Sequence, residues 1–277
     1  MPLTHVDGAT VSYQIDGEGP PLVLVSGTGG NLHSNWDHLI PALSATRQVI
    51  RVDYAGSAGA TVDPVHALTI ERMAEQVLGG VAAAGIEQFD LAGYSLGSAI
   101  AMHIAATQPQ RVRSLVLLAG FASGRDTRFA LQSSLWTFLI EHDPRSFAGM
   151  IVLTGLSPRA VSGFSQEELN GWIDAICQNN DWAGIRRQID LDSRLDVTAL
   201  LPQIQAPTLS IGCTHDHMVP PHHARGLAEA IPNAQYTELP CGHLAPFEQA
   251  EAYLQLLLEF TGRRQAAGGP GGTAAVA

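Results

Sequence analysis

Runs of apolar residues alternate along the chain with segments in which apolar positions recur at helical spacing. Apolar runs typical of strands covered on both faces occupy residues 21–27, 49–56, 89–95 and 114–120. Residues 207–213 and 234–240 look like further strands. The helical patterns lie between or after these runs, at residues 69–84, 97–107, 221–231 and 246–261. Such an alternation builds a mostly parallel sheet with helices on both of its faces.

The N-terminal segment LTHVDGATVSYQIDGEGPP has a different pattern, in which apolar and polar residues alternate. Two short alternating stretches are separated by Asp7-Gly8, a dipeptide that favours a tight hairpin turn. We expect this hairpin to add an antiparallel edge to the parallel strands. The chain therefore predicts an α/β fold with a mostly parallel eight-stranded sheet.

The alternation stops between residues 123 and 195, where helical stretches occur without any clear strand. We interpret residues 123–195 as an inserted helical cap, carried by a core made of residues 1–122 and 196–262. Aromatic side chains are common in lids over apolar sites, so Trp136 in this segment is a candidate substrate contact. The Gly/Ala-rich residues 263–277 are predicted to be a disordered tail.

Composition narrows the classes of function. The chain has 277 residues, of which 45% are hydrophobic and 15% charged, as expected for a compact protein. Its formal net charge of -11 argues against a nucleic-acid partner, because binding to phosphates needs clustered cations. All 15 basic residues are arginines, which excludes chemistry that depends on a lysine amine.

The sequence also predicts where the protein resides. Its 3 cysteines are far apart and form no CxxC pair, as expected in a reducing compartment. We see neither the basic nor the apolar part of a signal peptide, and no apolar run reaches the ~20 residues of a membrane helix. We therefore expect a cytoplasmic protein without a membrane partner. No oligomeric state follows from the pattern.

The most informative short motif is G-Y-S-L-G at residues 93–97. It follows a predicted strand and opens a predicted helix, which is the context of a nucleophile elbow. Such a corner would hold the Ser95 hydroxyl above the carboxyl edge of the sheet, where open α/β folds bind ligands. A glycine-rich turn in which Ser95 merely caps the helix is the simpler alternative. The motif alone does not decide between the two.

Two residues much later in the chain favour the interpretation of Ser95 as a nucleophile. Asp216 and His243 each lie just past a predicted strand, so both side chains can converge with Ser95 on one rim. A serine hydroxyl attacks only when a base removes its proton. We therefore expect Ser95 to attack, His243 to accept and return the proton, and Asp216 to orient the imidazole.

With the serine elbow, the order Ser-Asp-His and the D-x-x-V-P turn at 216–220, the sequence resembles an α/β-hydrolase with a helical cap along nearly its whole length. The resemblance implies a catalytic triad of Ser95, Asp216 and His243. It also implies an oxyanion hole made by the backbone N–H groups of Thr28 and Leu96. The loop SGTGG at 26–30 carries Thr28, and its Gly27 and Gly29 are candidate substrate contacts. This loop has Ser26 where the family often has histidine.

Other polar residues near the expected rim have simpler interpretations. Asp126 is a second candidate acid, but its position beyond the strand end, next to Arg125, favours a solvated ion pair. A cluster of histidines around Asp216 raises the possibility of a metal site: His215, His217, His222 and His223. Two of them follow Pro220-Pro221 at an expected helix start, where side chains are solvated. We therefore predict no metal and no cofactor.

The leading functional hypothesis is a cofactor-free serine hydrolase that cleaves an ester, thioester or lactone of a small hydrophobic or aromatic metabolite. A non-hydrolytic enzyme on the same fold, such as a lyase, a C–C bond-cleaving enzyme or a cyclase, is the first alternative. A small-molecule binding protein that has lost turnover is the second. The substrate itself cannot be derived from the sequence.

Overall fold

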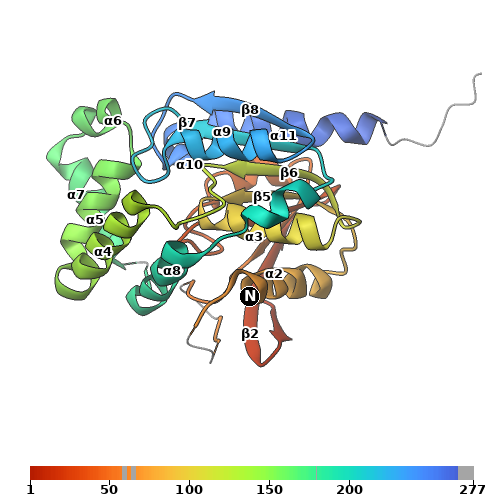
Figure 1. Cartoon of the computed structure of the whole chain (residues 1–277), viewed down its shortest axis with the longest axis horizontal. Coiled ribbons are helices and arrows are strands. Elements are labelled where there is room, and N and C mark those ends of the chain that lie inside the picture. The colour runs from red at the N-terminus through yellow and green to blue at the C-terminus, as the bar shows by residue number, and fades with distance from the viewer. Residues whose placement is uncertain (58–60, 64–66, 179, 268–277) are drawn as a thin grey trace, which may run out of the picture.

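The computed structural model describes residues 1–57, 61–63, 67–178 and 180–267. Within them lies an eight-stranded sheet with the order β1-β2-β4-β3-β5-β6-β7-β8 (Figure 1). The strands are β1 Leu3–Val6, β2 Ala9–Asp16, β3 Pro21–Val25, β4 Gln48–Val52, β5 Phe89–Tyr94, β6 Val112–Leu118, β7 Thr208–Cys213 and β8 Ala234–Leu239. The predicted fold class is confirmed, and each apolar run contains or overlaps one strand.

The opening hairpin forms as the sequence predicts. β1 pairs antiparallel with β2, and the two turn residues between them, Asp7 and Gly8, have φ values of 44° and 80°. Positive φ at both positions gives the turn the twist that a two-residue hairpin needs. β2 also pairs antiparallel with β4, and all strands from β4 to β8 in the sheet order are parallel.

Helices cover both faces of the sheet and define two apolar clusters. One face packs against α2 (Ile70–Ala83), α3 (Leu96–Thr107) and α9 (Pro221–Ala230). The opposite face packs against α1 (Ile40–Ser44) and α11 (Ala250–Ala267). α2 begins where its sequence signal predicts, because the Thr69 hydroxyl caps the helix by accepting a hydrogen bond from the backbone N–H of Arg72.

A group of helices is inserted between β6 and β7. The group comprises α4 Thr127–His142, α5 Pro144–Gly155, α6 Pro158–Gly163, α7 Gln166–Gln178 and α8 Trp182–Arg194, followed by the 3-10 helix η1 Thr198–Gln203. Figure 1 shows α4 to α7 gathered at one end of the molecule, in green, and α8 closer to the helices of the sheet. No helix among the described residues is both long enough and apolar enough to span a bilayer.

Three details differ from the sequence pattern. The segment 246–261 forms two helices, α10 (Ala245–Glu248) and α11, because Gln249 between them adopts φ −132° and ψ 45°. α1 and η1 are too short to show a helical periodicity in the sequence. α11 continues to Ala267 and so takes in the first part of the predicted tail, whereas residues 268–277 lie outside the described residues.

Candidate active site

A tight corner between β5 and α3 positions Ser95. Its backbone has φ 54° and ψ −121°, a strained conformation for a residue with a side chain. The flanking glycines permit the corner, because a Cβ on Gly93 would lie 2.4 Å from the carbonyl oxygen of Gly97. A Cβ on Gly97 would lie 2.3 Å from the carbonyl oxygen of Ser26. This is the geometry of a nucleophile elbow rather than of an ordinary helix cap, and Ser95 makes no side-chain capping hydrogen bond.

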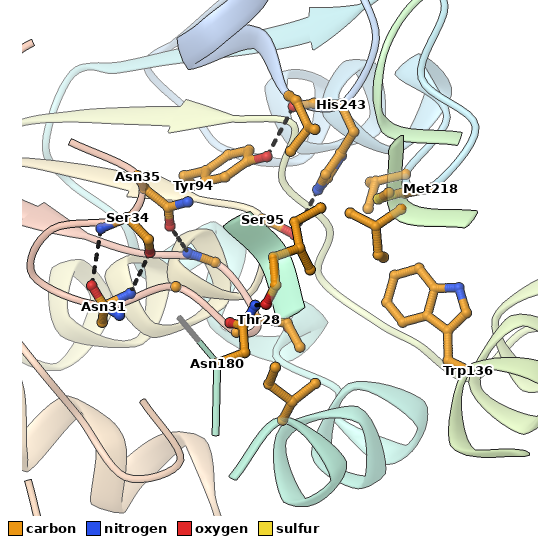
Figure 2. Close-up of a pocket in the computed structure, with 18 of the residues that line it drawn as sticks. Thr28, Asn31, Ser34, Asn35, Tyr94, Ser95, Trp136, Asn180, Met218 and His243 are labelled. Atoms are coloured by element: carbon orange, nitrogen blue, oxygen red, sulfur yellow. Dashed lines mark hydrogen bonds between the residues drawn. The ribbon is translucent and has the colours of Figure 1, made fainter. Parts of the chain in front are cut away.

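The three residues that the sequence singled out lie in a hydrogen-bonded chain. The Nε2 atom of His243 lies 3.0 Å from the Oγ atom of Ser95, and its Nδ1 atom lies 2.7 Å from Oδ2 of Asp216 (Figure 2). All three residues are buried. With Nδ1 protonated toward Asp216, Nε2 is free to accept the proton of the serine hydroxyl. The arrangement can therefore generate a nucleophile.

Two further contacts hold the acid and the base in place. Oδ1 of Asp216 accepts hydrogen bonds of 2.8 Å from the backbone N–H groups of both Met218 and Val219. The hydroxyl of Tyr94 donates to the backbone carbonyl of His243 at 3.0 Å, and the two rings are tilted with centroids 5.2 Å apart. The carboxylate and the imidazole are thus oriented by groups from β5 and from the segment after β7.

Of the two expected oxyanion donors, Thr28 lines the cavity and Leu96 follows Ser95 directly in the chain. Thr28 and Ser95 both line the central cavity, and Leu96 begins α3, where backbone N–H groups point outward. Among the described residues, no hydrogen bond engages the backbone N–H of Thr28 or of Leu96. Gly27 lets the loop approach the serine, since a Cβ there would lie 3.0 Å from Cβ of Ser95. Both N–H groups are available to a developing negative charge.

Ser26, which replaces the histidine common in the family, is integrated into the loop. Its hydroxyl accepts a hydrogen bond of 2.8 Å from the indole N–H of Trp36 and donates to the carbonyl of Asn31 at 3.1 Å. The hydroxyl of Tyr54 donates to the Ser26 carbonyl at 2.5 Å. Asn35 also accepts from the backbone N–H of Gly27 at 3.3 Å. A small hydroxyl therefore supplies loop contacts from this position.

A cavity of about 540 Å³ is lined by Ser95 and His243 and has two chemically different ends. Figure 2 shows Asn31, Ser34 and Asn35 on one side of Ser95 and Trp136 and Met218 on the other. Aromatic and aliphatic side chains from the inserted helices and from the segment after β6 complete the apolar end: Phe121, Phe129, Trp136, Phe147, Ile151 and Trp172. The candidate contacts Gly27, Gly29 and Trp136 all line this cavity.

Asp126, His222 and His223, which the sequence also suggested as candidates, do not line this cavity. Asp126 caps α4 by accepting from the backbone N–H of Phe129 at 2.8 Å, and it lies 4.0 Å from Nε2 of His223. The rings of His222 and His223 are tilted against each other, with centroids 4.2 Å apart. In the part of the chain that the structure describes, no group of three His, Cys, Asp or Glu side chains could hold a metal ion.

Two buried polar residues on α8, Gln188 and Asp192, contact the loop of Thr28 and were not among the residues singled out from the sequence. Asp192 accepts a hydrogen bond of 2.6 Å from the Thr28 hydroxyl, and Gln188 accepts one of 2.8 Å from the backbone N–H of Gly29. Burial raises the pKa of Asp192 to about 7, a rise that the Thr28 hydrogen bond and nearby His243 only partly oppose. The spacing of four residues on a helix was the available signal, but it is shared by many surface pairs.

Comparison with known proteins finds relatives that have the α/β-hydrolase fold. A family model described as alpha/beta hydrolase fold matches residues 20–250. A pyrrolizixenacetamide deacetylase from Xenorhabdus hominickii is 45% identical over 260 residues, which cover 94% of this chain and 97% of the relative.

Solved structures share the fold. The crystal structure of an enol-lactonase from Burkholderia xenovorans LB400 has a TM-score of 0.83 and 25% identity, with 94% of this chain and 100% of that chain covered. A meta-cleavage product hydrolase from Pseudomonas fluorescens IP01 has a TM-score of 0.81 at 23% identity, with coverages of 95% and 98%, and supports the fold alone. A family model that spans most of the chain, together with a relative at 45% identity that is itself a hydrolase, shows that this protein is an α/β hydrolase.

Proposed function

We propose that this protein is a serine hydrolase that removes a small acyl group from an apolar or aromatic compound. The observation that carries the proposal is the continuous hydrogen-bonded chain from Ser95 Oγ through His243 to Asp216, with distances of 3.0 and 2.7 Å. A hydroxyl at a strained elbow, a base within reach and an orienting carboxylate are the parts that acyl transfer requires.

The reaction follows from this geometry. Ser95 Oγ adds to the carbonyl carbon of the substrate while His243 Nε2 takes the hydroxyl proton. The resulting oxyanion lies between the backbone N–H groups of Thr28 and Leu96, at the positive end of α3. The imidazolium then protonates the leaving alcohol or amine as its bond to the carbonyl carbon breaks. Water, deprotonated by the same imidazole, releases the acid and restores Ser95, so the cycle needs no cofactor.

The cavity supports a small and largely apolar substrate. A volume of about 540 Å³ is within the range of sites for small molecules, and aromatic side chains dominate the end under the inserted helices. We propose that residues 123–195 serve as the cap that supplies this apolar end. The 45% identical relative is a deacetylase of an acetamide, which extends the proposed substrates from esters and lactones to N-acyl compounds.

A covalent probe tests the role of Ser95. A fluorophosphonate should label the wild-type protein once, at Ser95, and should not label Ser95→Ala, whose unfolding temperature should match that of the wild type. Ser34→Ala is the matched control, because Ser34 lines the same cavity and its hydroxyl instead accepts from the backbone N–H of Asn31. Full turnover by Ser95→Ala, or labelling that disappears only in Ser34→Ala, would contradict the proposal.

A pair of matched substrates tests the reaction class. p-Nitrophenyl acetate and p-nitroacetanilide carry the same acyl group and ring and differ only in the ester or amide link. We expect hydrolysis of both, faster for the ester because p-nitrophenolate leaves more readily than the anilide. Both rates should depend on Ser95 and His243. Turnover of neither compound, at any acyl chain length from acetyl to hexanoyl, would refute acyl transfer.

A further inference from the structure

Two side chains one helical turn apart on α8 reach across to the loop that carries the oxyanion donor. The Thr28 hydroxyl donates to Oδ2 of Asp192 at 2.6 Å, and the adjacent Gly29 N–H donates to Oε1 of Gln188 at 2.8 Å. These contacts bridge 164 and 159 residues of sequence. The inserted helix α8 therefore forms hydrogen bonds to two consecutive residues, Thr28 and Gly29, of the loop after β3.

α8 is itself fixed against the sheet. The amide of Gln188 donates to the carbonyl of Ala55 at 3.1 Å, so one fully buried side chain ties α8 to two loops at once. Gly184 packs against the same segment, since a Cβ there would lie 2.3 Å from the carbonyl oxygen of Gly56. Such close backbone contact leaves α8 little room to slide. It provides a firm anchor for the loop.

Within the described part of the chain, the carboxyl of Asp192 makes no hydrogen bond other than the one to Thr28. It is only 7% exposed, lines the cavity, and its second oxygen, Oδ1, makes no hydrogen bond among the described residues. A buried carboxyl with half of its hydrogen-bonding capacity unused is unfavourable for stability. Because burial raises its pKa to about 7, the group is largely neutral in mildly acidic solution. Among the described residues, its one hydrogen bond is to Thr28, the expected oxyanion donor.

We propose that Asp192 and Gln188 are positioning residues that hold Thr28 and Gly29 from α8, so that the Thr28 N–H points at the oxyanion. The hydroxyl and the N–H belong to the same residue, so anchoring the hydroxyl fixes the rotation of the peptide that carries the donor. The neighbouring bond from Gly29 to Gln188 fixes the following peptide. The oxyanion hole is therefore completed by the inserted helices and is not a property of the sheet and its loops alone.

This inference rests on the proposed acyl transfer, and its test separates the two. The variants are Asp192→Ala, which removes the anchor, Thr28→Val, which removes the hydroxyl but keeps the backbone N–H, and the double variant. Asp192→Asn keeps an oxygen that can accept from Thr28. Asp190→Asn is the matched control on the same helix, because its carboxylate is 57% exposed and pairs with Arg194.

The main readout is the split between kcat and KM for p-nitrophenyl acetate. Removing a whole oxyanion donor costs about 10²–10³ in kcat, so a misdirected donor should cost about tenfold to a hundredfold. We expect that loss in Asp192→Ala and in Thr28→Val, with KM changed by less than about threefold, and no further loss in the double variant. Asp192→Asn should recover most of kcat, and Asp190→Asn should equal the wild type.

A second readout reports on the hole directly. A trifluoromethyl ketone adds to Ser95 and places its oxyanion in the hole, so its inhibition constant should rise in parallel with the loss of kcat. If Asp192→Ala does not fold, Thr28→Val alone carries both measurements. A kcat within twofold of wild type in Asp192→Ala or Thr28→Val, or losses that multiply in the double variant, would overturn the inference. Retained turnover in Ser95→Ala would instead overturn the proposed function.

Discussion

The buried carboxyl of Asp192 should make the folded protein less stable as pH rises, and Asp192→Asn should remove that part of the dependence. Burial raises the pKa of this group from 3.8 to about 7, so the folded state binds its proton more tightly than the unfolded state does. The stabilisation that this bound proton provides is fully present below the unfolded-state pKa of 3.8. It decreases as pH rises toward the folded-state pKa of about 7. The amide variant carries no proton to lose and has nearly the same shape.

The size of the effect follows from the two pKa values. One pKa unit corresponds to about 1.4 kcal/mol, so the rise from 3.8 to about 7 amounts to about 4 kcal/mol over the whole window. Of this, about 2 to 3 kcal/mol falls between pH 5 and pH 8. Asp53, whose pKa burial raises to about 6, acts in the same direction in every variant. The difference between wild type and Asp192→Asn therefore isolates Asp192.

Urea unfolding at pH 5 and pH 8 measures this difference, with Asp190→Asn as the control. We expect the free energy of unfolding of Asp192→Asn, taken relative to that of the wild type, to increase by about 2 to 3 kcal/mol from pH 5 to pH 8. The control should follow the wild type, because Asp190 is an exposed carboxylate on the same helix. If the free-energy gap between wild type and Asp192→Asn is the same at both pH values, the carboxyl titrates as an ordinary aspartate and the reasoning is refuted.

Three further outcomes test the site and the packing. Gly97→Ala should lose activity and stability because its Cβ would lie 2.3 Å from the Ser26 carbonyl oxygen. Gly171→Ala, which has open space around it in α7, should instead increase the free energy of unfolding in urea by about 0.5–1 kcal/mol. Trp136→Ala should raise KM for an aryl ester at least about fivefold, and Phe138→Ala, at a side chain 57% exposed, should not. Turnover of any accepted substrate in heavy-oxygen water should place solvent oxygen in the acid product, a result that a lyase or cyclase would not give.

Most of the parallel sheet was predictable because its inner strands are buried on both faces. A run such as PLVLV needs no alternation to be recognised, and its ends are defined by the proline before it and the glycine loop after it. The split between α10 and α11 was not predictable. The apolar pattern continues across Gln249, and only its backbone angles interrupt the helix.

The positions of Ser95, Asp216 and His243 were predictable because each lies within four residues of the end of a parallel strand. The carboxyl ends of parallel strands lie at one edge of the sheet, so three short local motifs were enough to place three side chains near one another. The distances between them were not in the sequence. They depend on the twist of the sheet and on partners such as Tyr94, whose hydroxyl donates to the His243 carbonyl.

The contribution of α8 could not be predicted because no local motif accompanies it. Asp192 and Asp190 lie on one helix two residues apart, and nothing in their neighbours' identities says which carboxyl faces the core. The answer comes from the close contact between Gly184 and Gly56, which turns one side of α8 toward the loop that carries Thr28. A local sequence motif indicates where a strand ends and a sharp turn follows. The orientation of an inserted helix depends instead on its tertiary contacts. The side chains of α8 that contact the loop of Thr28 are therefore found from the packing of this helix and not from a local motif.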